Sequence, residues 1–302
     1  MVGTGRTLLL NTGARLPAIG LGTYEARDVA SIKKGIELGY RQIDTAMYYL
    51  NEAEVGQAVR ECGVPREELF VTTKLWCTFH SRVRESFESS MEKLGLEYID
   101  LFMMHWPTAL NPNGNHPYEP TLPDGSSDIQ KDWDFIKTWA DMQKLLDTGR
   151  VRAIGVSNFS TVNLDKLLAA PTTTVVPAVN QVELHPYLPQ FKLLNYCKEK
   201  GIVLTGYSPL GSVSAPLLQE KVVIEMAERL GKTPAQVILS WAVTRGTSVI
   251  PKSVNPQRQL SNLDDFVMAP EDMALIDDIS KTTQKRIVTS SWGQGTFHDD
   301  EF

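Results

Sequence analysis

Short apolar runs alternate along this chain with stretches in which apolar residues recur at helical spacing. Parallel strands need a crossover of a dozen or more residues between them, so this alternation predicts a parallel sheet covered by helices. The runs are almost continuously apolar, which predicts strands that are buried on both faces. They lie at residues 18–23, 41–46, 69–75, 99–105, 151–157, 177–183, 202–208 and 248–253.

Eight such units predict the α/β class, in the form of a (β/α)8 TIM barrel. An open, doubly wound sheet is the alternative that the pattern leaves. Helical spacing is clear after the third run, where Val83, Phe87, Met91 and Leu94 share one face. With 42% hydrophobic residues and no stretch of linker composition, residues 1–302 are predicted to form a single domain.

Three segments stand outside the alternation. Residues 7–19 contain two apolar arms around an Asn-Thr-Gly turn, which predicts a β-hairpin. Residues 107–131 follow the fourth run and are rich in Pro, Gly, Asn and Asp, so they are predicted to form a long lid or binding loop. The tail from residue 281 onward carries aromatic residues, and we expect it to pack over the top face of the barrel rather than stay solvated.

Charge and composition limit the class of partner. The chain has 30 Lys and Arg residues against 36 Asp and Glu residues, a net charge of -6 without a basic run, which argues against nucleic acid and favours a small-molecule substrate. No apolar stretch is long enough for a signal-peptide core or a membrane span, so a cytoplasmic protein is expected. We also expect a monomer. Cys62, Cys77 and Cys197 lie far apart and are predicted to be buried thiols. No metal-binding motif occurs, so no metal is expected.

Four residues of complementary chemistry follow successive runs: Asp44, Tyr49, Lys74 and His105. The carboxyl ends of barrel strands meet at one face, so these side chains are predicted to lie close together. Asp44 would hold the Lys74 ammonium, whose charge is predicted to lower the pKa of Tyr49 from its reference value of about 10. Such a phenol can donate a proton to a carbonyl oxygen that His105 orients, which indicates carbonyl reduction. The structural alternative is a set of ion pairs that only stabilise the barrel rim.

Polar residues also end the later runs, and they suit a nicotinamide cofactor. Amides and hydroxyls on adjacent strands can bind a carboxamide, and the ring of Tyr207 offers a face for stacking. Arg258 and Asn262 lie four residues apart on the next predicted helix, which indicates a phosphate site near its N-terminus. Solvated loops are the alternative for each residue taken alone. The strand-end residues of this set are Ser157, Asn158, Gln181, Tyr207, Ser208, Lys252 and Ser253.

Several stretches match a known family in sequence and in order. They include RQIDTAMYYLNEAEVG, LFVTTKLW, DLFMMHWP, GVSNF, NQVELHPYL and IPKSVNPQR. Over nearly its full length the chain resembles the aldo-keto reductases, in their aldehyde and aldose reductase branch. It is similar to fungal members of the glycerol dehydrogenase type, which reduce glyceraldehyde and related polyol aldehydes. The resemblance implies that the N-terminal hairpin closes the bottom of the barrel.

The resemblance also implies roles for particular residues. Asp44, Tyr49, Lys74 and His105 correspond to a catalytic tetrad in which Tyr49 is the general acid. NADPH is the implied cofactor, in preference to NADH. The implied cofactor contacts are Ser157, Asn158 and Gln181 at the nicotinamide carboxamide, Tyr207 on its ring, Ser208, Leu210 and Ser212 at the pyrophosphate, Lys252, Ser253 and Arg258 at the 2′-phosphate, and Asn262 at the adenine. The implied walls of the substrate pocket are Tyr24, Trp76, Trp106 and Trp292.

These features together predict an NADPH-dependent reduction of aldehydes to primary alcohols, with Tyr49 as proton donor. Small polyol or sugar-derived aldehydes such as glyceraldehyde are the expected substrates, and the reverse oxidation of polyols stays open. A barrel glycosidase is one alternative, and it would need two strand-end carboxylates, for which Asp44 and Glu183 are the candidates. A protein that binds NADPH as a sensor or scaffold is the other.

Overall fold

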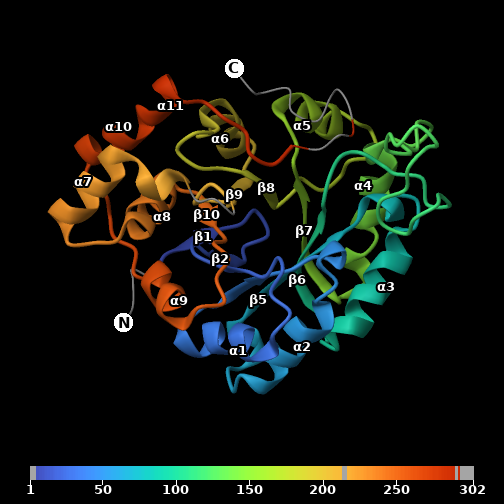
Figure 1. Ribbon diagram of the computed structural model, residues 1–302. Coiled ribbons are helices and arrows are strands. Elements are labelled where there is room, and N and C mark those ends of the chain that lie inside the picture. The colour runs from blue at the N-terminus through green and yellow to red at the C-terminus, as the bar shows by residue number, and fades with distance from the viewer. Residues whose placement is uncertain (1–4, 213–215, 290–291, 293–302) are drawn as a thin grey trace.

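The computed structural model describes residues 5–212, 216–289 and 292, and within them eight parallel strands form one sheet in chain order (Figure 1). Its first and last strands are joined by parallel bridges from Ile19 to Val249 and from Gly22 to Lys252, so the sheet closes on itself. The predicted barrel is therefore confirmed, and the open-sheet alternative is wrong. The strands are β3 (Leu21–Gly22), β4 (Gln42–Asp44), β5 (Phe70–Leu75), β6 (Ile99–Met104), β7 (Val151–Ser157), β8 (Val179–Glu183), β9 (Val203–Tyr207) and β10 (Ser248–Val249).

Helices surround the strands and cover the outer face of the sheet (Figure 1). The helix that carries Val83, Phe87, Met91 and Leu94 buries all four side chains, as the spacing predicts, and ends at Gly95 in the left-handed conformation. The helices are α1 (Val29–Leu38), α2 (Glu52–Glu61), α3 (Val83–Leu94), α4 (Phe135–Gln143), α5 (Thr161–Leu168), α6 (Phe191–Glu199), α7 (Lys221–Leu230), α8 (Pro234–Thr244), α9 (Pro256–Leu263), α10 (Pro270–Asp277) and α11 (Ile279–Thr282).

The predicted N-terminal hairpin consists of β1 (Thr7–Leu9) and β2 (Arg15–Pro17), paired antiparallel. Leu10 and Leu16 are buried in a cluster with residues from the amino ends of β5 and β8, such as Phe70 and Val179. Burial of this apolar surface holds the hairpin across the amino ends of the strands. The hairpin therefore closes the bottom of the barrel, as predicted.

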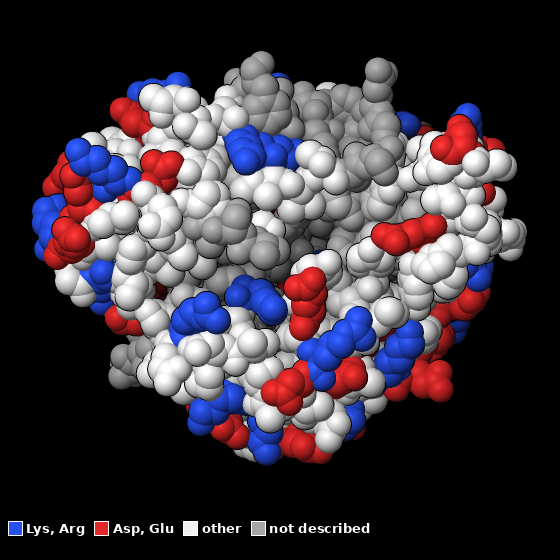
Figure 2. Space-filling model, viewed as in Figure 1, with Lys and Arg blue, Asp and Glu red and all other residues white. Residues whose placement is uncertain are grey.

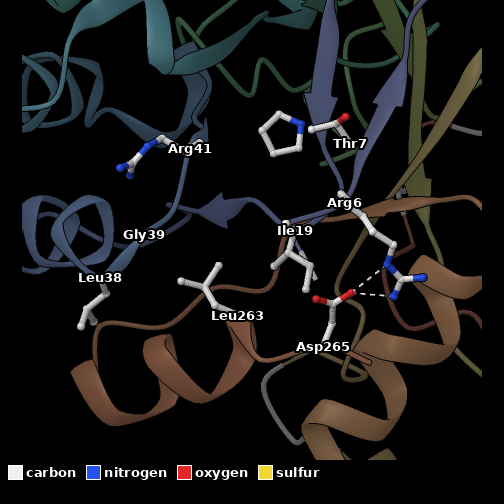
Figure 3. Close-up of a pocket in the computed structure, with 11 residues that line it drawn as sticks. Arg6, Thr7, Ile19, Leu38, Gly39, Arg41, Leu263 and Asp265 are labelled. Carbon is white, nitrogen blue, oxygen red and sulfur yellow. Dashed lines mark hydrogen bonds and ion pairs between the residues drawn. The ribbon is translucent and has the colours of Figure 1, made fainter. Parts of the chain in front are cut away.

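A cavity of about 240 Å³ lies beside this hairpin, between it and the ends of α1 and α9 (Figure 3). Its two arginines are used by the protein itself. The guanidinium of Arg6 donates to Asp265 at 3.0 and 2.6 Å, and that of Arg41 donates to the carbonyls of Ile36 and Tyr40. The cavity is at the end of the barrel opposite to the carboxyl ends of the strands.

The long loop and the tail both lie at the carboxyl ends of the strands. The indole of Trp76 donates to the carbonyl of Tyr118 at 2.7 Å, and the hydroxyl of Thr78 donates to that of Pro117 at 2.8 Å. Backbone amides of the tail bind Glu183, the last residue of β8.

None of the helices in the described part of the chain has the length and the apolar character needed to cross a bilayer.

The three cysteines are free thiols. Cys77 and Cys197 are buried as predicted, whereas Cys62 is partly exposed. Cys62 is the C-cap of α2 and packs against the core while staying partly exposed, so the prediction that it is buried is wrong.

Candidate active site

The four predicted catalytic residues come together at the top of the barrel. Asp44 ends β4, Lys74 is the penultimate residue of β5, and His105 directly follows β6. Tyr49 ends a short 3-10 helix, η1 (Met47–Tyr49), in the loop after β4. Parallel pairing aligns neighbouring strand ends, which is why these distant residues meet.

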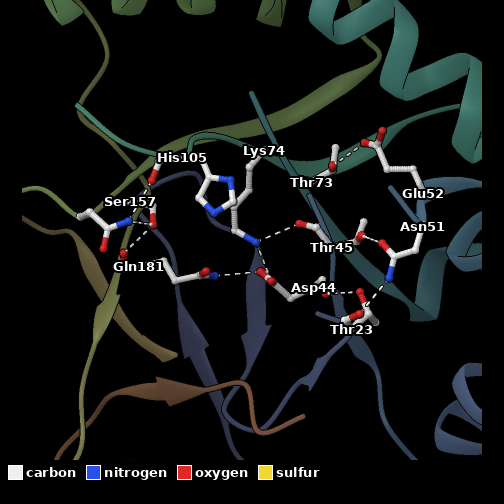
Figure 4. A network of polar contacts seen from close by, with 11 residues as sticks. Thr23, Asp44, Thr45, Asn51, Glu52, Thr73, Lys74, His105, Ser157 and Gln181 are labelled. Atoms are coloured by element: carbon white, nitrogen blue, oxygen red, sulfur yellow. Dashed lines mark hydrogen bonds and ion pairs between the residues drawn. The ribbon is translucent and has the colours of Figure 1, made fainter. Parts of the chain in front are cut away.

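Lys74 and Asp44 form a fully buried ion pair (Figure 4). The Lys74 ammonium donates to Asp44 Oδ1 at 2.6 Å and to the carbonyl of Thr45 at 2.8 Å, which uses two of its three donors. The other carboxylate oxygen of Asp44 accepts from the Gln181 amide at 2.8 Å. Burial lowers the pKa of Lys74 from its ordinary value, and the Asp44 carboxylate opposes that shift.

Tyr49 lies against Lys74, whose ammonium is 5.1 Å from the centre of the phenol ring. Burial raises the pKa of Tyr49 well above its ordinary value, and the charge of Asp44 adds to the shift. The predicted lowering of this pKa by Lys74 is therefore wrong. Burial removes the water that would stabilise a phenolate. The single ammonium nearby, that of Lys74, is already paired with the Asp44 carboxylate and does not compensate for this loss. The phenol consequently stays protonated at neutral pH and is able to donate its proton.

His105 is a neutral imidazole in this site. Burial lowers its pKa well below the ordinary value, and the charge of Lys74 lowers it further. Its ring lies edge-on to Tyr49 with centroids 5.7 Å apart, and its Nδ1 is buried without a hydrogen-bond partner among the described residues. A neutral imidazole offers one N–H donor, which suits a carbonyl oxygen held beside the phenol.

Asn51 was not recognised as part of the site from the sequence. It precedes α2, where an asparagine is usually the helix N-cap, but its side chain makes no capping bond. It turns inward, accepts from the Thr45 hydroxyl at 2.7 Å, and donates to the carbonyls of Thr23 and Ala26 at 2.8 Å each. These bonds hold the loop that carries Tyr24 and the segment whose carbonyl binds Lys74.

Predicted nicotinamide contacts lie next to this network. The Ser157 hydroxyl donates to the carbonyl of Gln181, and the Asn158 amide donates to the carbonyl of His105 at 2.9 Å. The Tyr207 hydroxyl donates to Asn158 Oδ1 at 2.8 Å, which anchors the outer end of its ring. Because the nitrogen of the Gln181 amide is used by Asp44, its oxygen remains as an acceptor for a carboxamide N–H.

The backbone beside these side chains is also unusual. Asn158, Ser208 and Ser212 all have positive φ, between 50° and 63°, although none of them is glycine. Such strain is tolerated where a binding site requires a particular backbone shape. Leu210, between the two serines, is partly buried against the core. The residues present therefore fit a nicotinamide and the start of a pyrophosphate.

Two cations lie on the rim of this face. Lys252 follows β10 and Arg258 is in the first turn of α9; both are exposed, and neither pairs with a carboxylate of the described residues. Figure 2 shows a hollow in this face with Lys and Arg side chains beside it, over the region of α9. Ser253 is partly exposed next to them, while Asn262 is only 5% exposed. Cations with no protein partner near a helix N-terminus fit a phosphate.

Aromatic side chains line the approach to Tyr49. Trp76 and Trp106 are almost fully buried, and the Trp292 ring lies edge-on to both, at 5.7 and 4.9 Å between centroids. Tyr24 is 49% exposed with its ring 5.1 Å from that of Tyr49. The structure therefore brings the four predicted wall residues around the catalytic cluster.

Tyr48 is a further aromatic residue that the sequence did not indicate. Its ring stacks on Trp76 with centroids 3.9 Å apart, and its hydroxyl donates to Glu119 of the long loop at 2.6 Å. No local signal distinguishes it from a solvent-facing tyrosine beside Tyr49.

Comparison with known proteins agrees with this geometry. The model of the aldo/keto reductase family matches residues 18–281. This chain belongs to the aldo/keto reductase family. An aldehyde reductase and a glycerol 2-dehydrogenase (NADP(+)) of Saccharomyces cerevisiae are each 49% identical to it over 296 residues, covering 95% of both chains. A D-galacturonate reductase of Hypocrea jecorina is 45% identical over 277 residues, covering 90% of this chain and 89% of its own.

The structures also agree. An aldose reductase from Schistosoma japonicum matches this aldo/keto reductase with a TM-score of 0.90 and 35% sequence identity, over 98% of this chain and 100% of that one. The glycosidase alternative is not supported by the geometry. A glycosidase would need Glu183 as its second catalytic carboxylate. Glu183 is fully buried and accepts from two backbone amides and from His185, so it is not available as a general acid or base for a sugar.

For this aldo/keto reductase we expect aldehyde reduction to proceed at a constant rate between about pH 6 and about pH 9. The lowered pKa of His105 keeps it neutral throughout, and the raised pKa of Tyr49 keeps it protonated throughout. The measurement is kcat/KM for glyceraldehyde against pH. A steady decline above about pH 7 would show instead that the complete site lowers the pKa of Tyr49, as the sequence suggested.

Proposed function

We propose that this aldo/keto reductase reduces aldehydes to primary alcohols with NADPH, and that its substrates are small polyol or sugar-derived aldehydes such as glyceraldehyde. The observation that carries the proposal is the buried Lys74–Asp44 pair placed against the protonated phenol of Tyr49, with neutral His105 beside it. The same arrangement also supports polyol oxidation when the alcohol and NADP⁺ are in excess.

NADPH supplies the hydride when it is bound. Tyr49 gives its proton to the substrate oxygen as negative charge develops there, and His105 donates a hydrogen bond that orients the same oxygen. The positive charge of Lys74 stabilises the phenolate that is left, and Asp44 holds the ammonium in place. Trp76 and the other aromatic walls exclude water from the reacting atoms.

The cofactor assignments rest on the donors and acceptors of the described residues. We assign the carboxamide to Ser157, Asn158 and Gln181, and the face of the ring to Tyr207. The remaining assignments are Ser208, Leu210 and Ser212 for the pyrophosphate, Lys252, Ser253 and Arg258 for the 2′-phosphate, and Asn262 for the adenine. The exposed, unpaired cations on the rim support NADPH over NADH, and one of the similar yeast enzymes is named for NADP(+).

We expect the replacement Arg258→Ala to weaken use of NADPH by about 10- to 100-fold while changing NADH little, because a charge-assisted bond to a phosphate contributes about 1.5–3 kcal/mol. The measurement is KM for each cofactor at saturating aldehyde. Arg150→Ala is a matched control, since that guanidinium pairs with Glu88 of α3 and lies next to the amino end of β7, away from the site. An equal loss for both cofactors would mean that Arg258 supports the fold rather than the 2′-phosphate.

The substrate class is supported by the names of the similar proteins, which act on aldehydes, glycerol and a sugar acid. The direct test is oxidation of NADPH, followed by its absorbance, with a panel of glyceraldehyde, short aliphatic aldehydes, an aromatic aldehyde and a uronate. Tight NADPH binding without turnover of any aldehyde would favour the sensor alternative instead.

We further propose that the enzyme is cytoplasmic and monomeric. Three free thiols are typical of a reducing compartment, and every residue of the site comes from one barrel. Size-exclusion chromatography with light scattering tests the second point, since a stable dimer at micromolar concentration would contradict it.

A further inference from the structure

A buried carboxylate outside the catalytic cluster binds the tail. Glu183 ends β8 and is fully buried. Its Oε1 accepts from the backbone N–H of Ile287 at 2.7 Å and lies 2.7 Å from His185 Nε2, while its Oε2 accepts from the N–H of Val288 at 2.8 Å. The guanidinium of Arg286 is 3.8 Å from Oε2. Both oxygens are therefore engaged, and neither is engaged with the catalytic residues.

The tail depends on this carboxylate for its position. Residues 283–289 form neither helix nor strand, so no ladder of backbone hydrogen bonds holds them. Among the described residues, backbone amides of this segment donate to the end of β8 and to the loop after it, where the Lys285 N–H donates to the carbonyl of Tyr187 at 3.0 Å. A buried carboxylate is costly unless its lone pairs are satisfied, and here two consecutive amides of the tail satisfy them.

The tail that Glu183 holds is a wall of the substrate pocket. Val288, whose N–H binds Glu183, packs against the cluster that contains Trp76 and Trp106, and Trp292 packs against the same cluster four residues later. The Trp76 ring lies edge-on both to His105, at 5.1 Å between centroids, and to Trp292, at 5.7 Å. We therefore expect a small aldehyde beside Tyr49 to contact the inner rings, and a longer or aromatic aldehyde to extend to Val288 and Trp292.

We propose that Glu183 is a positioning residue that clamps the tail over the pocket and so sets the preference of the enzyme for long and aromatic aldehydes. It acts through Ile287 and Val288 and does not touch the substrate. The clamp itself stands on the structure alone, whereas its effect on aldehydes rests on the proposed function.

Release of the tail is tested in the Glu183→Gln variant by limited proteolysis with trypsin. Glutamine has the same shape, but it can accept through one oxygen only and turns its NH2 group toward the second amide. Arg286 is 6% exposed in its side chain, so cleavage after it requires the tail to leave. We expect cleavage there to become about tenfold faster or more, because bonds to a charged acceptor are lost. An unchanged rate would overturn the clamp.

Asp100→Asn is the matched control. Asp100 is a buried carboxylate that accepts a backbone N–H from Val71 and a guanidinium from Arg66, but it lies in β6 near the bottom of the barrel. We expect this variant to lower the melting temperature without faster cleavage after Arg286. If cleavage after Arg286 became equally faster in both variants, the cause would be a general loss of stability rather than release of the tail, and the proposal would be overturned.

Kinetics test the consequence for the substrate. In Glu183→Gln we expect KM for 4-nitrobenzaldehyde to rise about tenfold, with glyceraldehyde changed by less than about twofold and the Kd of NADPH unchanged. Equal losses for both aldehydes would overturn the role in specificity. If the wild type reduces no aldehyde but trypsin still cleaves Glu183→Gln faster after Arg286, the proposed function is wrong and the clamp is supported.

Discussion

Replacing Tyr49 with phenylalanine is expected to lower the rate of aldehyde reduction by about 10²- to 10⁴-fold or more, since the ring is kept and only the proton donor is lost. NADPH should bind the variant with an affinity within a few-fold of wild type. Its Kd from fluorescence titration and kcat from NADPH oxidation measure the two effects separately. Burial raises the pKa of Tyr49, which keeps the phenol protonated and able to donate the proton that phenylalanine lacks.

Tyr48→Phe is the control for this variant, because it removes a phenol from the same 3-10 helix without touching the proposed acid. The Tyr48 ring would still stack on Trp76, while its bond to Glu119 would be lost. We expect it to keep at least about a tenth of the rate. Retention of that much activity by Tyr49→Phe would rule out Tyr49 as the general acid.

Replacing Asp44 with asparagine is expected to lower the free energy of unfolding by about 3–5 kcal/mol, because it leaves the ammonium of Lys74 buried without its counter-charge. Reduction should fall at the same time, since the ammonium that faces Tyr49 loses its anchor. Urea unfolding measures the first effect. Glu88→Gln is a suitable control: its pair with Arg150 is on the surface, and removing it should cost no more than about 1 kcal/mol.

The stability loss in Asp44→Asn should depend on pH. Burial lowers the pKa of Lys74 in the folded protein, and removing the Asp44 carboxylate removes the contribution that opposed this shift. The unfolded lysine keeps a pKa of about 10.4, so between the two values the unfolded state binds more protons and stability rises with pH. We therefore expect the variant to recover part of its stability as the pH rises from neutral toward about 10.4, the pKa of the unfolded lysine. A loss that is constant with pH would show that a shape effect, not the ammonium, causes it.

Much of the fold and of the site was predictable from local patterns. Strand-like runs separated by helical periodicity predicted the eight strands of the barrel. Asp44, Lys74 and His105 each end or follow such a run, and parallel strand ends meet at one face whatever the details of packing. The wall residues Trp76 and Trp292, which were implied by the family resemblance rather than by a local pattern, also meet there.

Other features required the folded chain. The direction of the pKa shift of Tyr49 depends on how much water surrounding elements exclude, which no spacing of residues reports. Asn51 has the sequence signature of a helix cap, but the carbonyls of Thr23 and Ala26 compete for its amide only once the loops have packed.

The sequence by itself determined which strands form, how many there are and which side chains stand at their ends, because periodicity and strand direction are local properties. Only the tertiary structure decided which of those side chains face one another. Glu183 ends a strand as Asp44 does, yet one carboxylate anchors a lysine and the other binds backbone amides 104 and 105 residues away. Contacts at such separations depend on the path of the whole chain, and desolvation depends on everything that packs around them.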